Sequence, residues 1–296
     1  MHLCGLGIIF RTRHVNCPLC NHDSNVLFEK DGYPIRECVH CHHQYAELDL
    51  TPTHPTQIYD DSYFFDGGDG YPNYLREAEL LIEHGRRYAK LLRHYTDVGT
   101  VFDVGSAAGF ILKGFAEAGW QAYGIEPNDS MAAYAREVLH LDVTTGALEE
   151  FEMPHQFDLV TMIQVIAHFY DVRQAFDVVS RGLRSGGLLL IETWDRDSFP
   201  ARMLGANWHE YSPPSVVHWF SLDGLNWFLQ SYGFEAIAHG RPSKWLKGVH
   251  AKSLVRYKLD DIAGGKHLTH LVRAIPDNIK IPYPFFDLFW GLYKRL

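Results

Sequence analysis

Four cysteines are spaced as two pairs that could bind one metal ion. Two residues separate Cys17 from Cys20 and Cys38 from Cys41, and seventeen residues separate the two pairs. A two-residue gap lets both thiolates of a pair face one ion, and four thiolates form the tetrahedral sulfur set that suits zinc. Because four thiolates leave no open position for water, we expect a structural zinc ion. The alternatives are a redox dithiol pair, whose strand–helix–strand context is missing here, and four unrelated buried thiols.

A second group of residues has the pattern of a nucleotide-binding turn. The segment VFDVGSAAGFIL places Asp103 at the end of an expected strand, then Gly105, small residues, Gly109 and an expected helix. Glycines let the backbone approach a ligand closely, and a helix N-terminus favours a carboxylate or phosphate group. Glu126 follows Gly105 by twenty-one residues, at the end of the next expected strand. A carboxylate at that place can accept hydrogen bonds from both ribose hydroxyls.

The spacing of the glycines separates two classes of cofactor. A dinucleotide site has the pattern G-x-G-x-x-G. Counted from Gly105, the second and third glycine positions hold Ala107 and Phe110. The Phe110 ring would crowd the helix–strand contact that a third glycine permits. The pattern therefore disfavours NAD and permits a smaller cofactor.

Alternating strands and helices would position these residues. We expect strands at VFDV, QAYGIE, FDLVTMI and GLLLIE, separated by the helices FILKGFAEAG, DSMAAYAREVL and VRQAFDVVSRGL, with glycine turns at Gly119 and Gly186-Gly187. This alternation is typical of βαβ units and a parallel sheet. A helix precedes them over residues 78–95, and Ser221 begins another, followed by the strand EAIAHG. The tail PFFDLFWGLYKRL is poorly spaced for an amphipathic membrane-surface helix and is predicted to be a strand.

The motifs together resemble those of class I S-adenosylmethionine-dependent methyltransferases. DVGSAAGFILKGFAEAGWQAYGIEPND is similar to their first two motifs, FDLVTMIQVIAHFYD to the fourth-strand motif, and LRSGGLLLIET to the fifth. NWHEYSPPSVVHWFSLDGLNWFLQSYGFE resembles the W…PP…H-x-x-F-S segment of a bacterial subgroup that often carries an N-terminal zinc ribbon. The resemblance covers roughly residues 15–240. It implies a Rossmann-like α/β sheet, mostly parallel with an antiparallel last strand.

The resemblance also implies a function and a division of the chain. The implied function is transfer of a methyl group from S-adenosylmethionine to a small-molecule acceptor, a sugar or a secondary metabolite. The alternative is a zinc-ribbon adaptor that binds a protein or nucleic acid without catalysis. The expected parts are an N-terminal segment (1–14), a zinc ribbon (15–50), a linker and helical cover (51–98), and the methyltransferase domain (99–296), with a helical insertion around residues 241–275.

The site residues that the resemblance implies fall into three groups. The methionine end and the ribose of the cofactor would lie along two strand ends, and the adenine and the sulfonium along two further loops. The expected cofactor-binding residues are Asp103, Gly105, Ser106, Ala107, Gly109, Phe110, Glu126, Pro127, Ala147, Leu148, Gln164 and Val165. Ala107 occupies a position that is often glycine in the family, and Ala167-His168 replaces a frequent Glu-His pair.

The acceptor side of the site is less strongly indicated. His168 lies near the carboxyl end of a strand and is the candidate base, with capping or packing as the alternative role. Aromatic residues between the fifth strand and the next helix could form a lid or simply pack. The candidate substrate residues are Tyr71, Trp208, His209, Tyr211 and His218, and Tyr63 and Phe64 are candidates, with Tyr71, for closing over the cofactor.

The composition excludes several classes of protein. Hydrophobic residues make up 46% of the chain and charged residues 21%, a globular balance, and the net charge is −9. This negative charge argues against sequence-independent binding of nucleic acid. No apolar run reaches the length of a membrane span, and the first ten residues lack the features of a signal peptide. The clustered cysteines favour a reducing compartment, so we expect a cytoplasmic protein, while the sequence does not indicate its oligomeric state.

Overall fold

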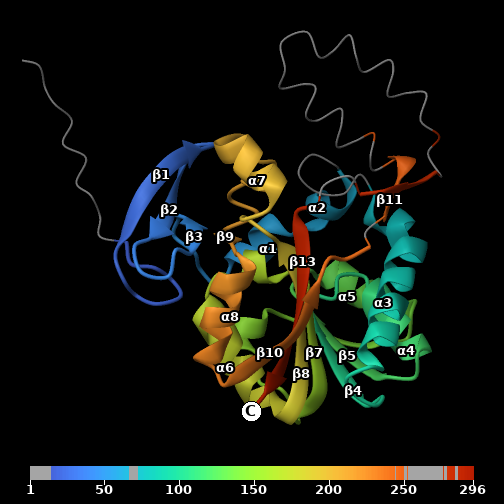
Figure 1. Ribbon diagram of the computed structural model, residues 1–296. Coiled ribbons are helices and arrows are strands. Elements are labelled where there is room, and N and C mark those ends of the chain that lie inside the picture. The colour runs from blue at the N-terminus through green and yellow to red at the C-terminus, as the bar shows by residue number, and fades with distance from the viewer. Residues whose placement is uncertain are drawn as a thin grey trace, which may run out of the picture.

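The computed structural model describes residues 15–66, 73–243, 245–249, 252, 276, 279–283 and 286–296. Its largest element is a seven-stranded sheet with the order β10-β13-β8-β7-β4-β5-β6 (Figure 1). The strands are β4 (Thr100–Val104), β5 (Gln121–Glu126), β6 (Asp142–Thr145), β7 (Phe157–Ile163), β8 (Leu183–Trp194), β10 (Phe234–Gly240) and β13 (Leu288–Arg295).

Strand direction in this sheet follows the sequence-based prediction. Neighbouring strands from β6 to β8 run parallel. The tail forms β13, which lies between β8 and β10 and is antiparallel to both. Both faces of β13 are covered, because Leu288, Phe289, Leu292 and Tyr293 are buried. The α/β class, the Rossmann-like sheet and the antiparallel tail strand are thus confirmed.

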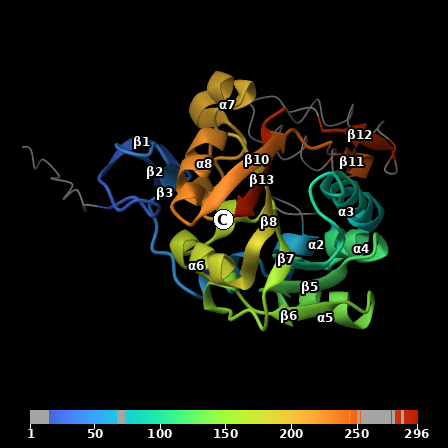
Figure 2. The same ribbon diagram turned by 60° about the horizontal axis from the view of Figure 1, so that its bottom comes forward.

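Helices cover both faces of the sheet because its strands are apolar on both sides. Val101 and Leu159 pack with helices α3 (Ala78–Leu92), α4 (Phe110–Glu117) and α5 (Asp129–Glu137). The next residues along each strand, Phe102 and Val160, pack with α6 (Val172–Gly182) and α8 (Leu222–Gln230). This alternation is the two-residue period of a strand. It produces the three layers seen in Figures 1 and 2.

The cysteine-rich segment forms a smaller sheet that is joined to the large domain. Its strands are β1 (Ser24–Lys30), β2 (Tyr33–Cys38) and β3 (Gln44–Ala46), and the fourth strand, β9 (His218–Trp219), comes from the segment before α8. Strands β3 and β9 are antiparallel, with Gln44 opposite Trp219 and Tyr45 opposite His218. Main-chain hydrogen bonds therefore connect the cysteine-rich segment to residues beside the large sheet.

The segment predicted as a linker contains short helices. They are α1 (His54–Ile58), α2 (Asp61–Phe65) and the 3-10 turn η1 (Tyr74–Glu77), which leads into α3. Asn128 fixes this segment to the end of β5, because its Nδ2 donates to the Tyr59 carbonyl at 3.0 Å and to Asp61 Oδ1 at 3.2 Å. The segment is therefore anchored to the carboxyl edge of the sheet.

One sequence-based expectation differs from the structure, and another lies mostly outside the described residues. Gly186-Gly187 is not a turn between elements, because β8 begins at Leu183 and runs through both glycines with a shift of register against β7. Gly186 has φ +76°, which a glycine adopts at little cost. Most of the expected helical insertion lies outside the described residues, as do residues 1–14, and its described part contains the strand β11 (Trp245–Lys247), paired with β12 (Lys280–Pro282).

Candidate functional site

A cavity of about 630 Å³ lies at the carboxyl ends of β4, β5, β7 and β8. Ligands of open α/β sheets bind at this edge, and the volume is in the range of small-molecule sites. Its walls come from the turn after β4, the end of β5, the loops after β6 and β7, and the α1–α2 segment. Of the expected cofactor residues, those lining it are Asp103, Gly105, Ser106, Ala107, Glu126, Pro127, Ala147, Leu148, Gln164 and Val165.

Each glycine of the turn after β4 has a positive φ and a side chain close to where a Cβ would lie. Gly105 has φ +64°, and a Cβ added there would lie 2.5 Å from Val165 Cγ2. Gly109 precedes α4 with φ +80°, and its Cβ would lie 2.8 Å from Leu141 Cδ1, behind the cavity. Ala107 also has a positive φ, +47°, in a region that costs a residue with a Cβ about 1–2 kcal/mol. The departure from glycine at this position is therefore accommodated with some backbone strain.

Two of the expected cofactor residues, Gly109 and Phe110, do not line the cavity. Phe110 has a structural role instead. Its side chain is 1% exposed and stacks on Tyr74, with ring centroids 5.7 Å apart. The ring therefore joins α4 to η1. Its contribution to the site is to hold the segment that covers the cavity.

Buried carboxylates lie at two neighbouring strand ends. Glu126 accepts hydrogen bonds of 2.8 Å from the backbone N–H groups of Ala107 and Asn128, one on each carboxylate oxygen. Asp103 Oδ1 accepts a 2.6 Å hydrogen bond from Thr161 Oγ1. Burial raises the pKa of Asp103 and that of Glu126 to about 7. A cationic or hydroxyl-bearing ligand would stabilise the ionised form of both groups.

A third buried carboxylate also lines the cavity. Glu149 belongs to the 3-10 turn η2 (Leu148–Glu150) and accepts a 3.0 Å hydrogen bond from the Tyr170 N–H. Burial raises the pKa of Glu149 to about 7. Its neighbours Ala147 and Leu148 line the cavity with apolar surface, which suits the flat face of a base.

A buried polar network positions the loop after β7. Gln164 has φ +58°, and its backbone N–H and its Nε2 donate to the backbone and side-chain oxygens of Glu192, both at 2.7 Å. His84 Nε2 lies 2.8 Å from Glu192 Oε2, to which Tyr88 also donates. Burial acts to raise the pKa of Glu192, but His84 and the hydrogen bonds outweigh it and lower the value to about 2. An ionised Glu192 therefore fixes Gln164 at the cavity wall.

The sequence analysis did not identify this network. Two signals were available: a single acidic residue, Glu192, ends an apolar strand, and His84 and Tyr88 are four residues apart on the apolar face of a helix. Such signals show that a carboxylate and an imidazole are buried. They do not show that the two groups meet.

His168 lines the cavity but is engaged by the surrounding chain. It ends the 3-10 turn η3 (Ile166–His168), and its Nδ1 lies 2.8 Å from both the Tyr59 hydroxyl and the Ser215 carbonyl. Burial lowers the pKa of His168 to about 4, although hydrogen bonds to Ser215 and Gln164 act in the opposite direction. An imidazole with this pKa is a weak base at neutral pH. The geometry favours a positioning role, which joins the α1 segment to the loop after β7.

The candidate substrate residues are separated by the fold. His209 lines the cavity, as do Tyr63 and Phe64, and Tyr71 lies outside the described residues. Three others are buried behind the cavity wall and do not line it. These three are Trp208, Tyr211 and His218. The Trp208 indole donates to Asp287 (3.0 Å), and the Tyr211 hydroxyl donates to Gln44 (2.6 Å). The His218 ring lies between the His43 ring (3.1 Å) and the Phe169 carbonyl (3.0 Å).

These three residues are buried because the cysteine-rich segment covers them. Strand β9 pairs with β3, so His218 and its neighbours face the small sheet instead of the cavity. Trp208 and Tyr211 belong to the apolar cluster that also contains Ile35 and Ala46 of that sheet. Of the two roles considered for these residues, packing is the one that the structure favours, at the interface between the two sheets.

The four cysteines of the two pairs converge at one point. Cys20 Sγ lies 3.4 Å from Cys38 Sγ and from Cys41 Sγ, and Cys17 Sγ lies 3.6 Å from Cys41 Sγ. The N–H groups of residues 40 and 41 point at Cys38 Sγ, both at 3.4 Å. With a metal–sulfur bond of about 2.3 Å, tetrahedral ligands lie about 3.8 Å apart. The donor set and its spacing therefore fit a zinc ion.

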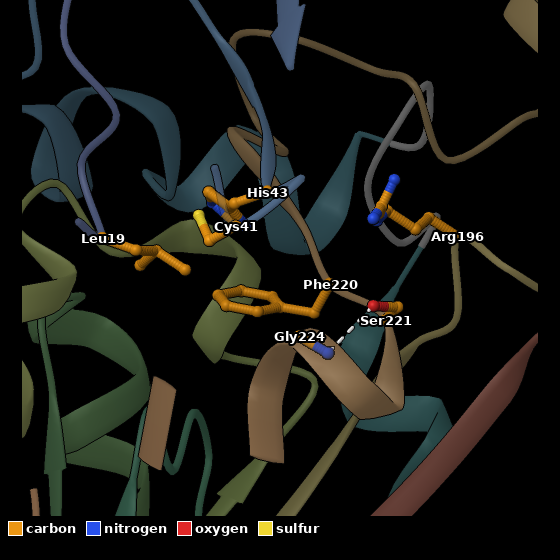
Figure 3. A pocket seen from close by; sticks show the side chains of 7 residues that line it. All are labelled: Leu19, Cys41, His43, Arg196, Phe220, Ser221 and Gly224. Atoms are coloured by element: carbon orange, nitrogen blue, oxygen red, sulfur yellow. Dashed lines mark hydrogen bonds between the residues drawn. The ribbon is translucent and has the colours of Figure 1, made fainter. Parts of the chain in front are cut away.

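The cysteine cluster lies directly against the large domain. Figure 3 shows Leu19, Cys41 and His43 of the cysteine-rich segment facing Phe220 and the first turn of α8 across a small crevice. Cys17, Leu19 and Cys38 belong to the same buried cluster as residues of α6 and α8. Order in the cysteine cluster is thus linked by packing to the segment between β8 and α8.

Comparison with known proteins agrees with this architecture. The model of a family described as "Methyltransferase domain" matches residues 74–239, more than half of the chain. A ubiquinone biosynthesis O-methyltransferase from Bradyrhizobium sp. (strain ORS 278) is 29% identical over 163 residues, which are 52% of this chain and 60% of that protein. One from Nitrobacter winogradskyi is 28% identical over 134 residues, 43% of this chain and 49% of that protein. The chain therefore matches only part of these relatives' length.

Solved structures show the same fold. Magnesium protoporphyrin IX methyltransferase from Synechocystis PCC 6803, solved with bound SAH, has a TM-score of 0.53 at 14% identity, over 81% of this chain and 100% of that chain. The YcgJ protein from Bacillus has a TM-score of 0.51 at 16% identity, over 72% of this chain and 98% of that chain. At such identities the likeness shows the fold alone. Together with the family match, the strand order and the cavity at the carboxyl edge of the sheet, it shows that this chain belongs to the methyltransferase domain family.

Proposed function

We propose that this protein transfers a methyl group from S-adenosylmethionine to a small-molecule acceptor. The observation that carries the proposal is Glu126, a buried carboxylate at the end of β5. Each of its oxygens accepts one backbone hydrogen bond of 2.8 Å, and a carboxylate oxygen has a second lone pair. Those lone pairs are suited to two ribose hydroxyls. The SAH named with the Synechocystis structure and the methyltransferase names of the sequence relatives support the same cofactor.

The residues around the cavity match the parts of this cofactor. Asp103 would face its ammonium group, the Gly105 turn its methionine backbone, and Ala147 and Leu148 its adenine ring. The cofactor supplies a methyl carbon bonded to a positively charged sulfur. Gln164, fixed by Glu192, would lie on the sulfonium side. The α1–α2 segment contributes Tyr59, Tyr63 and Phe64 to the cavity wall, and this cover would limit the access of water to the methyl carbon.

The transfer requires alignment more than a strong base. A lone pair of the acceptor forms the new bond to the methyl carbon, the bond from carbon to sulfur breaks, and its electron pair stays on sulfur. The acceptor proton leaves to water. Alignment of the reacting atoms supplies a large part of the rate in such displacements. Tyr59 and His168 serve this purpose by holding the loops on either side of the cavity.

The acceptor is proposed to be a sugar or a secondary metabolite. The cavity is also lined by aromatic and polar side chains outside the expected cofactor residues, including Tyr63, Trp194, His209 and Tyr283. Such a lining fits a compact molecule that carries both hydroxyl groups and apolar surface. The sequence relatives are named as O-methyltransferases, and this supports an oxygen as the acceptor atom.

Calorimetry with S-adenosylmethionine and with S-adenosylhomocysteine (SAH) tests the proposal. We expect one binding site per chain for each, and much weaker binding of NAD. Absence of binding of both compounds would overturn the methyltransferase proposal and leave an adaptor as the function.

We further propose that Cys17, Cys20, Cys38 and Cys41 bind one structural zinc ion. Four thiolates whose ligand atoms all lie within 4.8 Å of one another require a divalent cation to compensate their charge. A zinc ion held by thiolates is compatible with the reducing conditions of the cytoplasm, where we place the protein. Elemental analysis of the purified chain should give one zinc per chain, and the Cys41→Ser variant should lose most of it. A metal-free, folded protein would contradict this proposal.

A further inference from the structure

A second cluster of potential metal ligands lies at the cavity, far from the cysteines in sequence. His209 and Glu210 follow the 3-10 turn η4 (Gly205–Asn207), and Asp287 precedes β13. His209 Nε2 lies 2.9 Å from Glu210 Oε1, 3.0 Å from the Tyr283 hydroxyl and 3.6 Å from Asp287 Oδ2. His209, Glu210 and Tyr283 line the cavity. The cluster therefore borders the same cavity as the turn after β4.

The fold holds the cluster rigidly. The side chain of Asp287 is 0% exposed, and its carbonyl accepts a 2.6 Å hydrogen bond from the Asp195 N–H just after β8. The indole of Trp208, itself 1% exposed, donates to Asp287 Oδ2 at 3.0 Å. A backbone contact and a buried side chain thus orient this carboxylate toward His209.

One buried oxygen of the cluster lacks a hydrogen-bond partner among the described residues. This atom is Asp287 Oδ1. Leaving a charged oxygen without a partner away from water is costly, and such groups are normally paired or bound to a metal. The neighbouring Glu210 adds a second carboxylate, with its side chain 12% exposed. Nε2 of His209 carries at most one proton and can donate it to only one of the three oxygens around it.

The spacing of the ligand atoms fits one cation. One atom each from His209, Glu210 and Asp287 lies within 4.8 Å of the other two. Around an ion with bonds of about 2.1 Å, adjacent octahedral ligands are about 3.0 Å apart. The separations of 2.9 and 3.6 Å from His209 Nε2 to the two carboxylates are close to this value. Carboxylates are ligands suited to Mg²⁺ and Mn²⁺, and the softer imidazole favours Mn²⁺ of these two ions.

We propose that His209, Glu210 and Asp287 bind a divalent cation of the Mg²⁺ or Mn²⁺ type, and that the cation binds an oxygen of the acceptor. The inference rests on the proposed methyl transfer. It narrows the acceptor to molecules with a hydroxyl group whose oxygen can bind the ion. The cation favours loss of the hydroxyl proton to water. The resulting oxyanion forms the bond to the methyl carbon, while the bond from carbon to sulfur breaks and its electron pair stays on sulfur.

Binding of Mn²⁺ to the full chain tests this inference without a known acceptor. The protein is purified with its cysteine-bound metal, saturated with SAH, and titrated with Mn²⁺ while the spectrum of free Mn²⁺ is followed. We expect one Mn²⁺ per chain, no loss of zinc, and at least tenfold weaker binding in Glu210→Gln and in Asp287→Asn. Asp197→Asn, which removes an exposed carboxylate of the same region, is the matched control and should bind as the wild type does.

A second measurement on the wild type locates the ion even if the variants do not fold. In a spectrum of the tryptophan indole N–H groups, Mn²⁺ should broaden the signal of Trp208 and leave that of the exposed Trp227 unchanged. The cation site is overturned if no Mn²⁺ binds up to millimolar concentration, if folded Glu210→Gln binds Mn²⁺ like the wild type, or if Trp208 is not broadened. These results leave the methyl-transfer proposal in place when SAH binds, whereas failure of SAH to bind overturns that proposal directly.

Discussion

Substitution of Glu126 by Gln provides a quantitative test of the cofactor site. Hydrogen bonds to a charged group contribute about 1.5–3 kcal/mol each. Gln keeps one oxygen acceptor but loses the charge, and it places an amide N–H against the backbone N–H of either Ala107 or Asn128. We therefore expect a loss of about 2–4 kcal/mol in the binding of SAH, which is a ~30- to 1,000-fold rise in Kd.

The pKa of Glu126 adds a second expectation to the same experiment. Burial raises this pKa to about 7, and hydroxyl donors bind the ionised form. Protons therefore compete with the ligand below pH 7. From Glu126 alone, the wild-type affinity for SAH should be about tenfold weaker at pH 6 than at pH 8. The Glu126→Gln variant should lose this part of the pH dependence.

Isothermal titration calorimetry at pH 6, 7 and 8 measures both effects. Glu117→Gln, which alters an exposed glutamate on α4, is the control for the loss of a negative charge. Circular dichroism checks that each variant is folded. The assignment of Glu126 is refuted if folded Glu126→Gln binds SAH within threefold of the wild type, or if wild-type affinity does not change between pH 6 and pH 8.

Three further predictions concern backbone geometry, the buried network and pH. Gly105→Ala should weaken SAH binding at least tenfold, because the new Cβ would meet Val165 Cγ2 at 2.5 Å; Gly233→Ala, also at positive φ but with open space around it, should leave binding unchanged, and equal binding by both variants would contradict the steric argument. His84→Ala leaves the buried Glu192 without its imidazole partner and should lower the free energy of unfolding in urea by about 3–5 kcal/mol, whereas a loss below 1 kcal/mol would show that the pair is not needed. Without cofactor, the free energy of unfolding should fall by about 1 kcal/mol between pH 6.5 and pH 8, because the raised pKa values make the folded state bind protons more tightly than the unfolded state at Asp103, Glu126 and Glu149. This net fall includes the opposing effect of His43, His168 and His218, whose lowered pKa values offset about half of the carboxylate contribution over this range. Urea titrations at several pH values check the slope, and rising stability would disprove it.

Local spacing was sufficient to predict the convergence of the four cysteines and the shape of the turn after β4. Two cysteines separated by two residues can reach one ion wherever the segment is placed, so Cys17, Cys20, Cys38 and Cys41 were predicted together and do converge. The turn after β4 could be predicted for the same reason, because a short apolar strand, small residues with glycines, and an amphipathic helix follow one another directly in the sequence. Strand β13 could also be predicted from the sequence, because its apolar residues do not form a helical face.

Side chains that meet across long separations could not be predicted in this way. Trp208 and Tyr211 are aromatic residues in a loop, a pattern that fits a lid as well as it fits a core. Pairing of β3 with β9 decides between the two roles, because it places the cysteine-rich sheet over these side chains and buries them. No local feature of residues 208–219 indicates that a strand from residues 44–46 will lie beside them.

The sequence by itself determined the parallel sheet, the cofactor turn and the cysteine cluster, because each depends on residues that are close along the chain or on a repeated apolar pattern. Only the tertiary structure decided which polar groups share a site. Insertion of β13 beside β8 brings Asp287 to His209, and packing of α3 on the sheet brings His84 to Glu192. These pairs depend on strand order and helix placement, which are set by burial of the whole apolar surface and not by the identity of the paired residues.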